Sequence, residues 1–543
     1  MHGSGIETDP HHAGRGRRRS AIDRLADRVA RTTVFGHRID DVWAGLRQRR
    51  AAAHWTSLFG VVSAAALVVV TVTGVLLMFF YTPSGASTTY VGSYAPLHGT
   101  EVSHAFASTM HVTFDVPGGQ VLRQSHHWAG LLLPASIVLQ LVTTFFTGGF
   151  RRPRRGMWVL LLLAFIAALA TGWSGYALPD DMLSGTGLRI VEGIMLGIPV
   201  VGTMLKTVLF GGSFPGRIIE NLYPLHTVVL PGALLLFLAL RAVAAWRHGA
   251  PRFPGAHGAA RDGVPLIPTA AARAGGLFLV VTALLVLIAA TVTVSPIWLY
   301  GPADPGNAGA GSQPDWYTGF LDGALRLVPP GWEIVWLGRT WTLAILAPLA
   351  VVGAFFAAVA TYPFLEAWVS DDRREHDVLD RPRVAPTRTG IGVAGLVFAG
   401  VLWAAGGADV IAPAFSVSIE HVILSLQSAL LIGPFIAFSV TRRVCLGLQR
   451  KDRELLDHGY ETGRIVRLPG GEYVELHHPL DDAERARIAL PPTPPPPDIG
   501  PDRRGTRTVA RRVRARLWAI YAQDRVDAAE TRADSAQLPV SRR

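Results

Sequence analysis

Residues 123–147 read RQSHHWAGLLLPASIVLQLVTTFFT, and this stretch decides the class of fold. After its paired histidines it stays mostly apolar for about 20 residues, the length of helix that crosses a bilayer. Half of the 543 residues are apolar and the mean hydropathy is +0.31, so a soluble globular chain is disfavoured. We predict an all-α polytopic membrane protein with eight transmembrane helices, near 56–80, 128–147, 157–177, 222–246, 275–296, 341–362, 390–406 and 420–440.

The net charge of +11 is distributed unevenly over the loops. With the N-terminus placed inside, the inner loops hold thirteen arginines and the outer loops hold six basic residues. Basic inner loops orient membrane proteins, so we predict a cell-membrane protein with both termini in the cytoplasm. The basic balance thus reflects orientation and does not indicate nucleic-acid binding. The one cysteine, Cys445, excludes a disulfide within the chain.

The two ends of the chain are basic, and composition divides the whole into four parts. We expect an amphipathic surface helix over 23–54 and a basic helix over 503–530 that lies on the membrane or on a partner. Long loops are more often functional than incidental, which draws attention to 297–340. The predicted parts are the N-terminal tail 1–54, helices one to four in 55–250, helices five to eight with the loop 297–340 in 251–441, and the Pro-rich C-terminal tail 442–543.

Two histidines are placed to hold one haem between the second and fourth helices. His126 and His226 both stand near the outer ends of their helices, and neutral imidazole from two helices can clamp one haem iron. Haem needs close backbone approach, which Gly74 and Gly175 at the same level permit. His127 is adjacent to His126 and competes with it as a ligand. A covalent c-type site is excluded, because no Cys-x-x-Cys-His motif occurs.

A second haem would need ligands about four turns further in. Fourteen residues of helix rise roughly 21 Å and return to nearly the same face. The positions at that level are Gln140 and Arg241, and arginine stays cationic and cannot ligate iron. Leu161 stands fourteen residues before Gly175, where its side chain would occupy haem space. We predict that the inner haem is absent and that Gln140 and Arg241 hydrogen-bond across the emptied space, directly or through water.

Several short motifs together resemble cytochrome b of the respiratory cytochrome bc complex, in its long actinobacterial form. The match extends from Trp55 to about Leu480. The motifs that carry it are Phe59-Gly60, Thr73-Gly74, Arg123-x-x-His126, Phe145-Phe146-Thr147-Gly148, Arg151-Arg152-Pro153-Arg154, Gly175-Tyr176-x-Leu178-Pro179, Leu222-Tyr223-x-Leu225-His226, Pro314-Asp315-Trp316-Tyr317 and Cys445-Leu446-Gly447-Leu448-Gln449-Arg450.

The resemblance implies a quinol–cytochrome c oxidoreductase subunit that oxidises quinol, by family form menaquinol, at the outer face. His126 and His226 would ligate the outer haem b, and Arg123 would pair with a haem propionate. Asp315 would accept a quinol proton, with Tyr317 in the same motif; an alternative makes Asp315 an ordinary loop carboxylate. The implied partners are a Rieske iron–sulfur subunit, a c-type cytochrome subunit, a second copy of the chain and membrane lipid, with a terminal oxidase as a further candidate.

The replaced inner ligands leave more than one function open. The chain is a working reductase subunit, a one-haem electron-transfer paralogue that does not run the full quinone cycle, or a non-redox assembly relative. The retained His126, His226 and Asp315 argue against the last. A transporter is disfavoured, because no paired broken helices occur in matching halves of the chain.

Overall fold

The computed structural model describes residues 43–52, 54–249, 251–252, 263–304, 306, 313–489 and 509–522. Within these residues, eight helices are long and apolar enough to cross a membrane, as the sequence predicts. They are α3 (Leu58–Leu77), α5 (Gly119–Phe146), α6 (Arg155–Ala177), the span formed by α9 (Ile218–Pro224) and α10 (Leu230–His248), α11 (Ala271–Thr291), α14 (Leu343–Ser370), α15 (Pro386–Gly406) and α17 (Ile419–His458).

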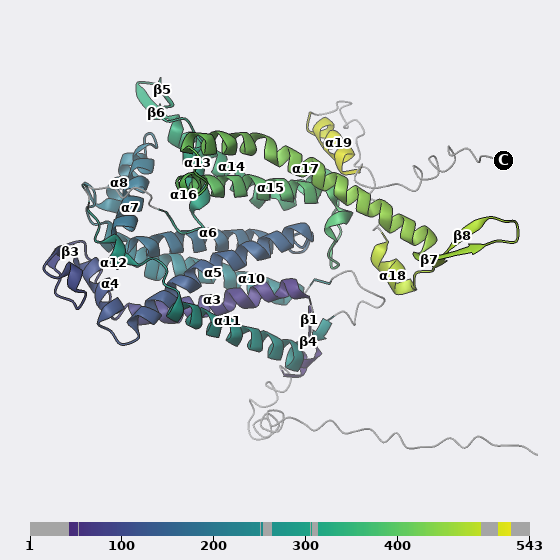
Figure 1. Ribbon diagram of the computed structural model, residues 1–543, viewed down its shortest axis with the longest axis horizontal. Helices are drawn as coiled ribbons and strands as arrows, with labels where there is room; N and C mark the ends of the chain where they lie inside the picture. Colours follow the sequence, from purple (N-terminus) through teal and green to yellow (C-terminus); the bar gives the residue numbers. More distant parts are fainter. Residues whose placement is uncertain are drawn as a thin grey trace, which may run out of the picture.

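The spanning helices lie side by side in two groups along the horizontal of Figure 1. In the first, α3 packs on α5, α5 on α6, α6 on α10, and α11 covers α3 and α5. In the second, α15 packs between α13 (Gly319–Arg326) and α17. The largest buried core lies inside the first group, around Ile137, Leu161 and Phe165. The first four spans therefore enclose a common interior, which apolar side chains fill around Leu161.

Shorter elements occupy the two ends of the helix stack (Figure 1). The segment 178–221 contains α7 (Met182–Leu196) and α8 (Gly202–Phe210). The loop 297–340 is not featureless, because it folds into α12 (Ile297–Tyr300), α13 and the hairpin of β5 (Glu333–Trp336) and β6 (Arg339–Thr342). The other elements are α4 (His104–Phe114), α16 (Ala408–Ala414), α18 (Asp482–Ile488), α19 (Val509–Ala522), and the antiparallel pairs β1 (Arg50–Ala52) with β4 (Gly263–Pro265), β2 (Ser87–Thr89) with β3 (Glu101–Ser103), and β7 (Tyr460–Arg467) with β8 (Tyr473–His478).

The predictions for the two tail helices have different outcomes. The helix expected over 23–54 lies outside the described residues up to 42. Residues 43–48 are helical, as expected, but the last part is wrong, because Arg50–Ala52 forms strand β1. The backbone of this strand pairs with β4, which replaces helical hydrogen bonding there. The basic helix expected within 503–530 is present as α19, residues 509–522. The Pro-rich spacer around 490–498 lies outside the described residues.

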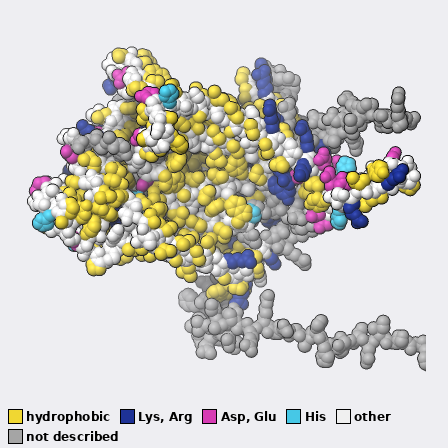
Figure 2. All heavy atoms as spheres, viewed as in Figure 1, with side chains coloured by type: hydrophobic (Ala, Val, Ile, Leu, Met, Phe, Trp, Pro, Cys, Tyr) yellow, Lys and Arg dark blue, Asp and Glu magenta, His cyan; other side chains and the backbone are white. Residues whose placement is uncertain are grey.

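The side chains on the outside of the helix stack are largely apolar. Figure 2 shows a broad hydrophobic surface over the middle of the molecule, with Lys and Arg gathered toward its right-hand end. That end carries the loop after α5 and the loop between α14 and α15, both rich in arginine. An apolar belt of this extent needs lipid to cover it, so the chain is a multi-pass membrane protein.

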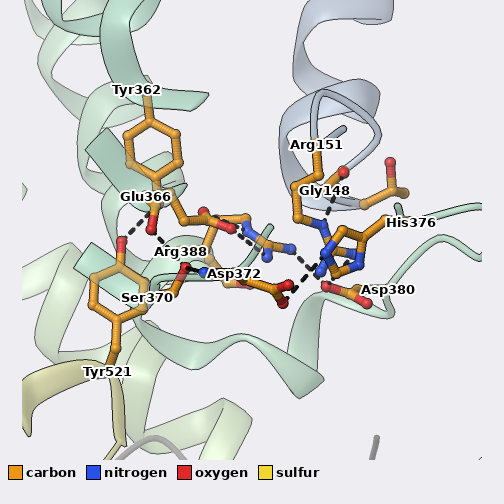
Figure 3. A network of polar contacts seen from close by, with 12 residues as sticks. Gly148, Arg151, Tyr362, Glu366, Ser370, Asp372, His376, Asp380, Arg388 and Tyr521 are labelled. Carbon is orange, nitrogen blue, oxygen red and sulfur yellow. Dashed lines mark hydrogen bonds and ion pairs between the residues drawn. The ribbon is translucent and has the colours of Figure 1, made fainter. Parts of the chain in front are cut away.

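A buried ion network joins the two helix groups at the arginine-rich end (Figure 3). Arg388 of α15 donates from Nε and Nη2 to both carboxylate oxygens of Glu366 of α14, at 2.9 and 2.8 Å. Its Nη1 donates to Asp380 at 2.9 Å, and Arg151 after α5 pairs with the same carboxylate at 2.8 Å. The Arg388 and Glu366 side chains are only 5% and 8% exposed. Two cations and two anions thus balance in a site with little water.

Replacing Glu366 with leucine is expected to destabilise the protein strongly. The change leaves Arg388 as an excess buried cation, and breaking a buried pair in this way costs about 3–5 kcal/mol. The thermal unfolding midpoint in detergent should fall accordingly. The matched control combines Glu366→Leu with Arg388→Met, which leaves Arg151 and Asp380 balanced and should recover most of the loss. An unchanged midpoint in the single variant would contradict this account of the network.

Candidate functional site

His126 and His226 face each other inside the first helix group. Their imidazole centroids are 6.2 Å apart and the ring planes lie at 73°. His126 comes from the second turn of α5, whereas His226 lies in a π-helical turn, Leu225–Val229, between α9 and α10. Such π turns occur often at functional sites, because they re-aim a side chain from a continuous helix. The structure therefore brings together the two residues that the sequence proposes as one ligand pair.

Hydrogen bonds fix the same tautomer on both rings. Thr73 donates its hydroxyl proton to the Val69 carbonyl at 2.6 Å, so its oxygen accepts from His126 Nδ1 at 3.1 Å. His226 Nδ1 donates to the Thr171 carbonyl at 2.9 Å, an atom that can only accept. Both Nε2 atoms are then unprotonated and carry a lone pair. Metal-bound histidines usually engage their other nitrogen in this way.

Glycines pack directly against the two imidazoles. A Cβ on Gly74 would lie 2.9 Å from His126 Cε1, and a Cβ on Gly175 would overlap the His226 ring. No other residue type fits these positions with the rings where they are. Both predicted glycines thus lie where close approach to the ligand pair requires them.

A cavity of about 490 Å³ opens beside the histidine pair, and Arg123 lines it. Arg123 is 8% exposed and donates to the Ser295 carbonyl at 3.3 and 3.4 Å. Its Nε has no hydrogen-bond partner among the described residues. A buried guanidinium with a spare donor suits an anionic carboxylate. The two Nε2 lone pairs, the glycines and Arg123 together fit a haem with its propionates.

Asp315 and Tyr317 line the same cavity from the loop before α13. The Tyr317 hydroxyl donates to one Asp315 oxygen at 2.8 Å, and His127 Nε2 donates to the other at 3.2 Å. Tyr317 is 3% exposed and its hydroxyl packs on Gly172, where a Cβ would be 2.5 Å away. Burial and the neighbouring Asp315 carboxylate raise the pKa of Tyr317 well above its usual value. The tyrosine therefore stays a proton donor to the carboxylate at physiological pH.

His127 contacts the loop and not the facing helix. One residue further along α5 turns a side chain by about 100°, which directs His127 to Asp315 while His126 faces His226. Sequence reasoning named His127 only as a competing ligand and missed this contact. It also missed Thr171, Gly172 and the π turn, because contacts across distant segments leave no local signal.

The inner level, where Gln140, Leu161 and Arg241 lie, lacks the features found around the histidine pair. Gln140 is 6% exposed and donates to the Ser63 hydroxyl at 2.8 Å, which lies 2.6 Å from the Ser136 hydroxyl. Leu161 is 1% exposed and packs in the main apolar core. These residues supply no imidazole and fill the interior with side chains, so they do not fit a second bis-histidine haem.

The expected direct hydrogen bond between Gln140 and Arg241 is not made. Gln140 instead donates to Ser63 of α3. Arg241 lies on α10 with its Nε buried and without a hydrogen-bond partner in the described part of the chain. The hydrogen bonds of Ser63 with Gln140 and Ser136 therefore link α3 to α5, and α10 takes no part in them.

Known proteins with similar sequences agree on one family. The family model described as "Cytochrome b(N-terminal)/b6/petB" matches residues 131–302. The cytochrome b subunit of the cytochrome bc1 complex from Streptomyces coelicolor is 42% identical over 451 residues, which cover 82% of this chain and 83% of that protein. The corresponding Mycobacterium tuberculosis subunit is 41% identical over 445 residues, covering 81% and 80% of the two chains.

A solved structure supports the same fold. A chain of "Hyperthermophilic respiratory Complex III" superposes with a TM-score of 0.55 at 17% identity, over 76% of this chain and 100% of that one. At that identity the likeness concerns the fold alone. With relatives above 40% identity over four fifths of its length, the chain belongs to the cytochrome b family.

Proposed function

We propose that this chain is the cytochrome b subunit of a quinol–cytochrome c oxidoreductase and that it oxidises quinol at the cavity beside His126 and His226. The observation that carries the proposal is the shared cavity, because the imidazole pair and the Asp315 carboxylate line one space. A quinol in this cavity would therefore lie next to both a proton acceptor and the site of a one-electron acceptor. By family form the substrate is menaquinol.

Different residues of this chain have different roles in quinol oxidation. Asp315 accepts a proton from the quinol hydroxyl, while Tyr317 and His127 hold its carboxylate in place by hydrogen bonds at 2.8 and 3.2 Å. His126 and His226 would hold a haem iron through their Nε2 lone pairs, and Arg123 would pair with a haem carboxylate. Haem b, when bound there, would accept one of the two electrons that the quinol gives up. The Rieske cluster of the proposed partner subunit would accept the other electron, and the second proton would leave on that side.

A single b haem per chain is part of the proposal. The inner level offers Gln140, Leu161 and Arg241 in place of ligands and space. The inner level lies about 21 Å further in. Without a haem there, an electron received at the outer level would have no second carrier in this bundle. These residues favour a second candidate, a one-haem electron-transfer paralogue that oxidises quinol without completing the usual cycle across the membrane.

The partners and orientation follow the family. The bc1 complexes to which the relatives belong imply a Rieske iron–sulfur subunit and a c-type cytochrome subunit, and we extend this to a homodimer in lipid, with a terminal oxidase as a further associate. The arginine-rich end in Figure 2 supports a cytoplasmic location for that end of the bundle. From the charge of the loops, we propose that both termini are cytoplasmic as well.

The test measures haem and quinol reactivity on the purified full chain. A pyridine haemochrome assay is expected to give one b haem per polypeptide. Anaerobic addition of a menaquinol analogue together with a Rieske partner should reduce that haem. Two haems per chain would overturn the single-haem proposal, whereas none would overturn the redox function and leave an assembly role.

A further inference from the structure

The C-terminal helix α19 docks along the end of α14 through one face. Arg511, Arg514, Trp518 and Tyr521 are partly buried, at the spacing of one helical stripe. The Tyr521 hydroxyl lies 2.9 Å from the Tyr362 hydroxyl of α14, and Arg514 pairs with Asp371 at 2.9 Å. Figure 3 shows Tyr521 reaching α14 beside the Glu366–Arg388 pair. The contact is therefore specific at two points.

The two contacts define how α19 lies relative to the membrane. Asp371 directly follows the last residue of α14, whereas Tyr362 stands eight residues before that end, about 12 Å back along the span. Arg514 and Tyr521 are seven residues, about 10 Å, apart along α19. The helix thus runs antiparallel to α14, and its C-terminal half lies at the depth of a membrane-spanning segment.

The face of α19 turned away from α14 is exposed and carries apolar side chains together with the cations Arg512 and Arg516. Val513, Leu517 and Ile520 stand at helical spacing and are 44%, 37% and 45% exposed. The helix VARRVRARLWAIYA contains four arginines, all in its first eight residues, and no acidic residue. Cations therefore gather at the end near Asp371, and apolar side chains gather at the deeper end.

We propose that α19 is a lipid-binding helix embedded in the leaflet at the arginine-rich end of the bundle, the inner leaflet under the proposed orientation. Its apolar stripe contacts acyl chains, and arginines near Arg516 contact anionic phospholipid headgroups. Apolar side chains at the deeper end and cations at the outer end match the polarity gradient of one leaflet, and basic residues are attracted to an anionic membrane surface. A protein partner would not require this gradient along the helix.

The test places a fluorophore at the deep end of the stripe in the full chain. Cys445 is first replaced by alanine, and Ile520→Cys is labelled with an environment-sensitive NBD group. In nanodiscs with acyl-brominated phospholipid, we expect a blue-shifted emission quenched by roughly twofold or more relative to unbrominated lipid. Val466→Cys on β7, an exposed position of the soluble hairpin, is the matched control and should not be quenched.

Three further outcomes decide the assignment. Quenching should be stronger with phosphatidylglycerol than with phosphatidylcholine alone, and Arg516→Gln should reduce that difference. No quenching at position 520 would overturn the proposal. Quenching in the isolated subunit that disappears when the partner subunits are added would assign this face to a protein partner and would also overturn it. None of these readouts depends on haem or quinol chemistry, so they are separable from the proposed function.

Discussion

Replacing His226 with leucine is expected to abolish haem binding, from one b haem per polypeptide to none. Both imidazoles would be needed to hold the haem iron, and leucine offers no lone pair to replace the Nε2 atom that the hydrogen bond to Thr171 keeps unprotonated. Leucine is close to histidine in size, so the helix packing should survive. The pyridine haemochrome assay and the α-band of the reduced spectrum measure the loss, and size-exclusion chromatography checks that the chain stays folded.

Two variants give this prediction its controls. His126→Leu should behave as His226→Leu does, whereas His127→Gln should keep the haem, because His127 points to Asp315. His226→Met supplies a thioether that can ligate haem iron and is expected to retain part of the haem with a shifted spectrum. Full haem retention in His226→Leu would mean that a different side chain is the ligand.

The membrane spans and the level of the histidine pair could be predicted from the sequence, because both follow simple periodicities. Hydropathy over about 20 residues marks a bilayer-spanning helix, and a fourteen-residue interval marks one helix face. The family motifs then singled out Asp315 and Tyr317 in a loop that periodicity alone leaves unassigned. The structure adds that these loop residues and the histidines line one cavity.

The contacts around the site could not be predicted from the sequence, and the reason is physical. His127 with Asp315 spans 188 residues, and Gln140 with Ser63 spans 77, so neither pairing has a local pattern. The π turn at His226 depends on how α9 and α10 pack, and the hydropathy of the span is the same without it. The helix α17 also exceeds the predicted span, because its extension to His458 is polar.

Replacing Asp315 with asparagine is expected to slow quinol oxidation by about 10²–10⁴-fold while haem content stays at one per chain. Asparagine keeps the size of the side chain, and its amide oxygen still accepts the hydrogen bond from Tyr317. It cannot take up a proton at neutral pH, so the reaction loses its base and the cavity keeps its shape. The rate of haem reduction by a menaquinol analogue in the reconstituted complex measures the effect.

Tyr317→Phe separates positioning from proton acceptance. Phenylalanine removes one hydrogen bond to the carboxylate and leaves the base, so the loss should be far smaller than in Asp315→Asn. A neutral hydrogen bond is worth about 1 kcal/mol, and one to a charged group about 1.5–3 kcal/mol, which corresponds to roughly 10- to 100-fold at most. Asp315→Asn with an unchanged rate would make Asp315 an ordinary loop carboxylate. Equal losses in the two variants would instead mean that the hydroxyl of Tyr317, held against Gly172, contacts the quinol itself.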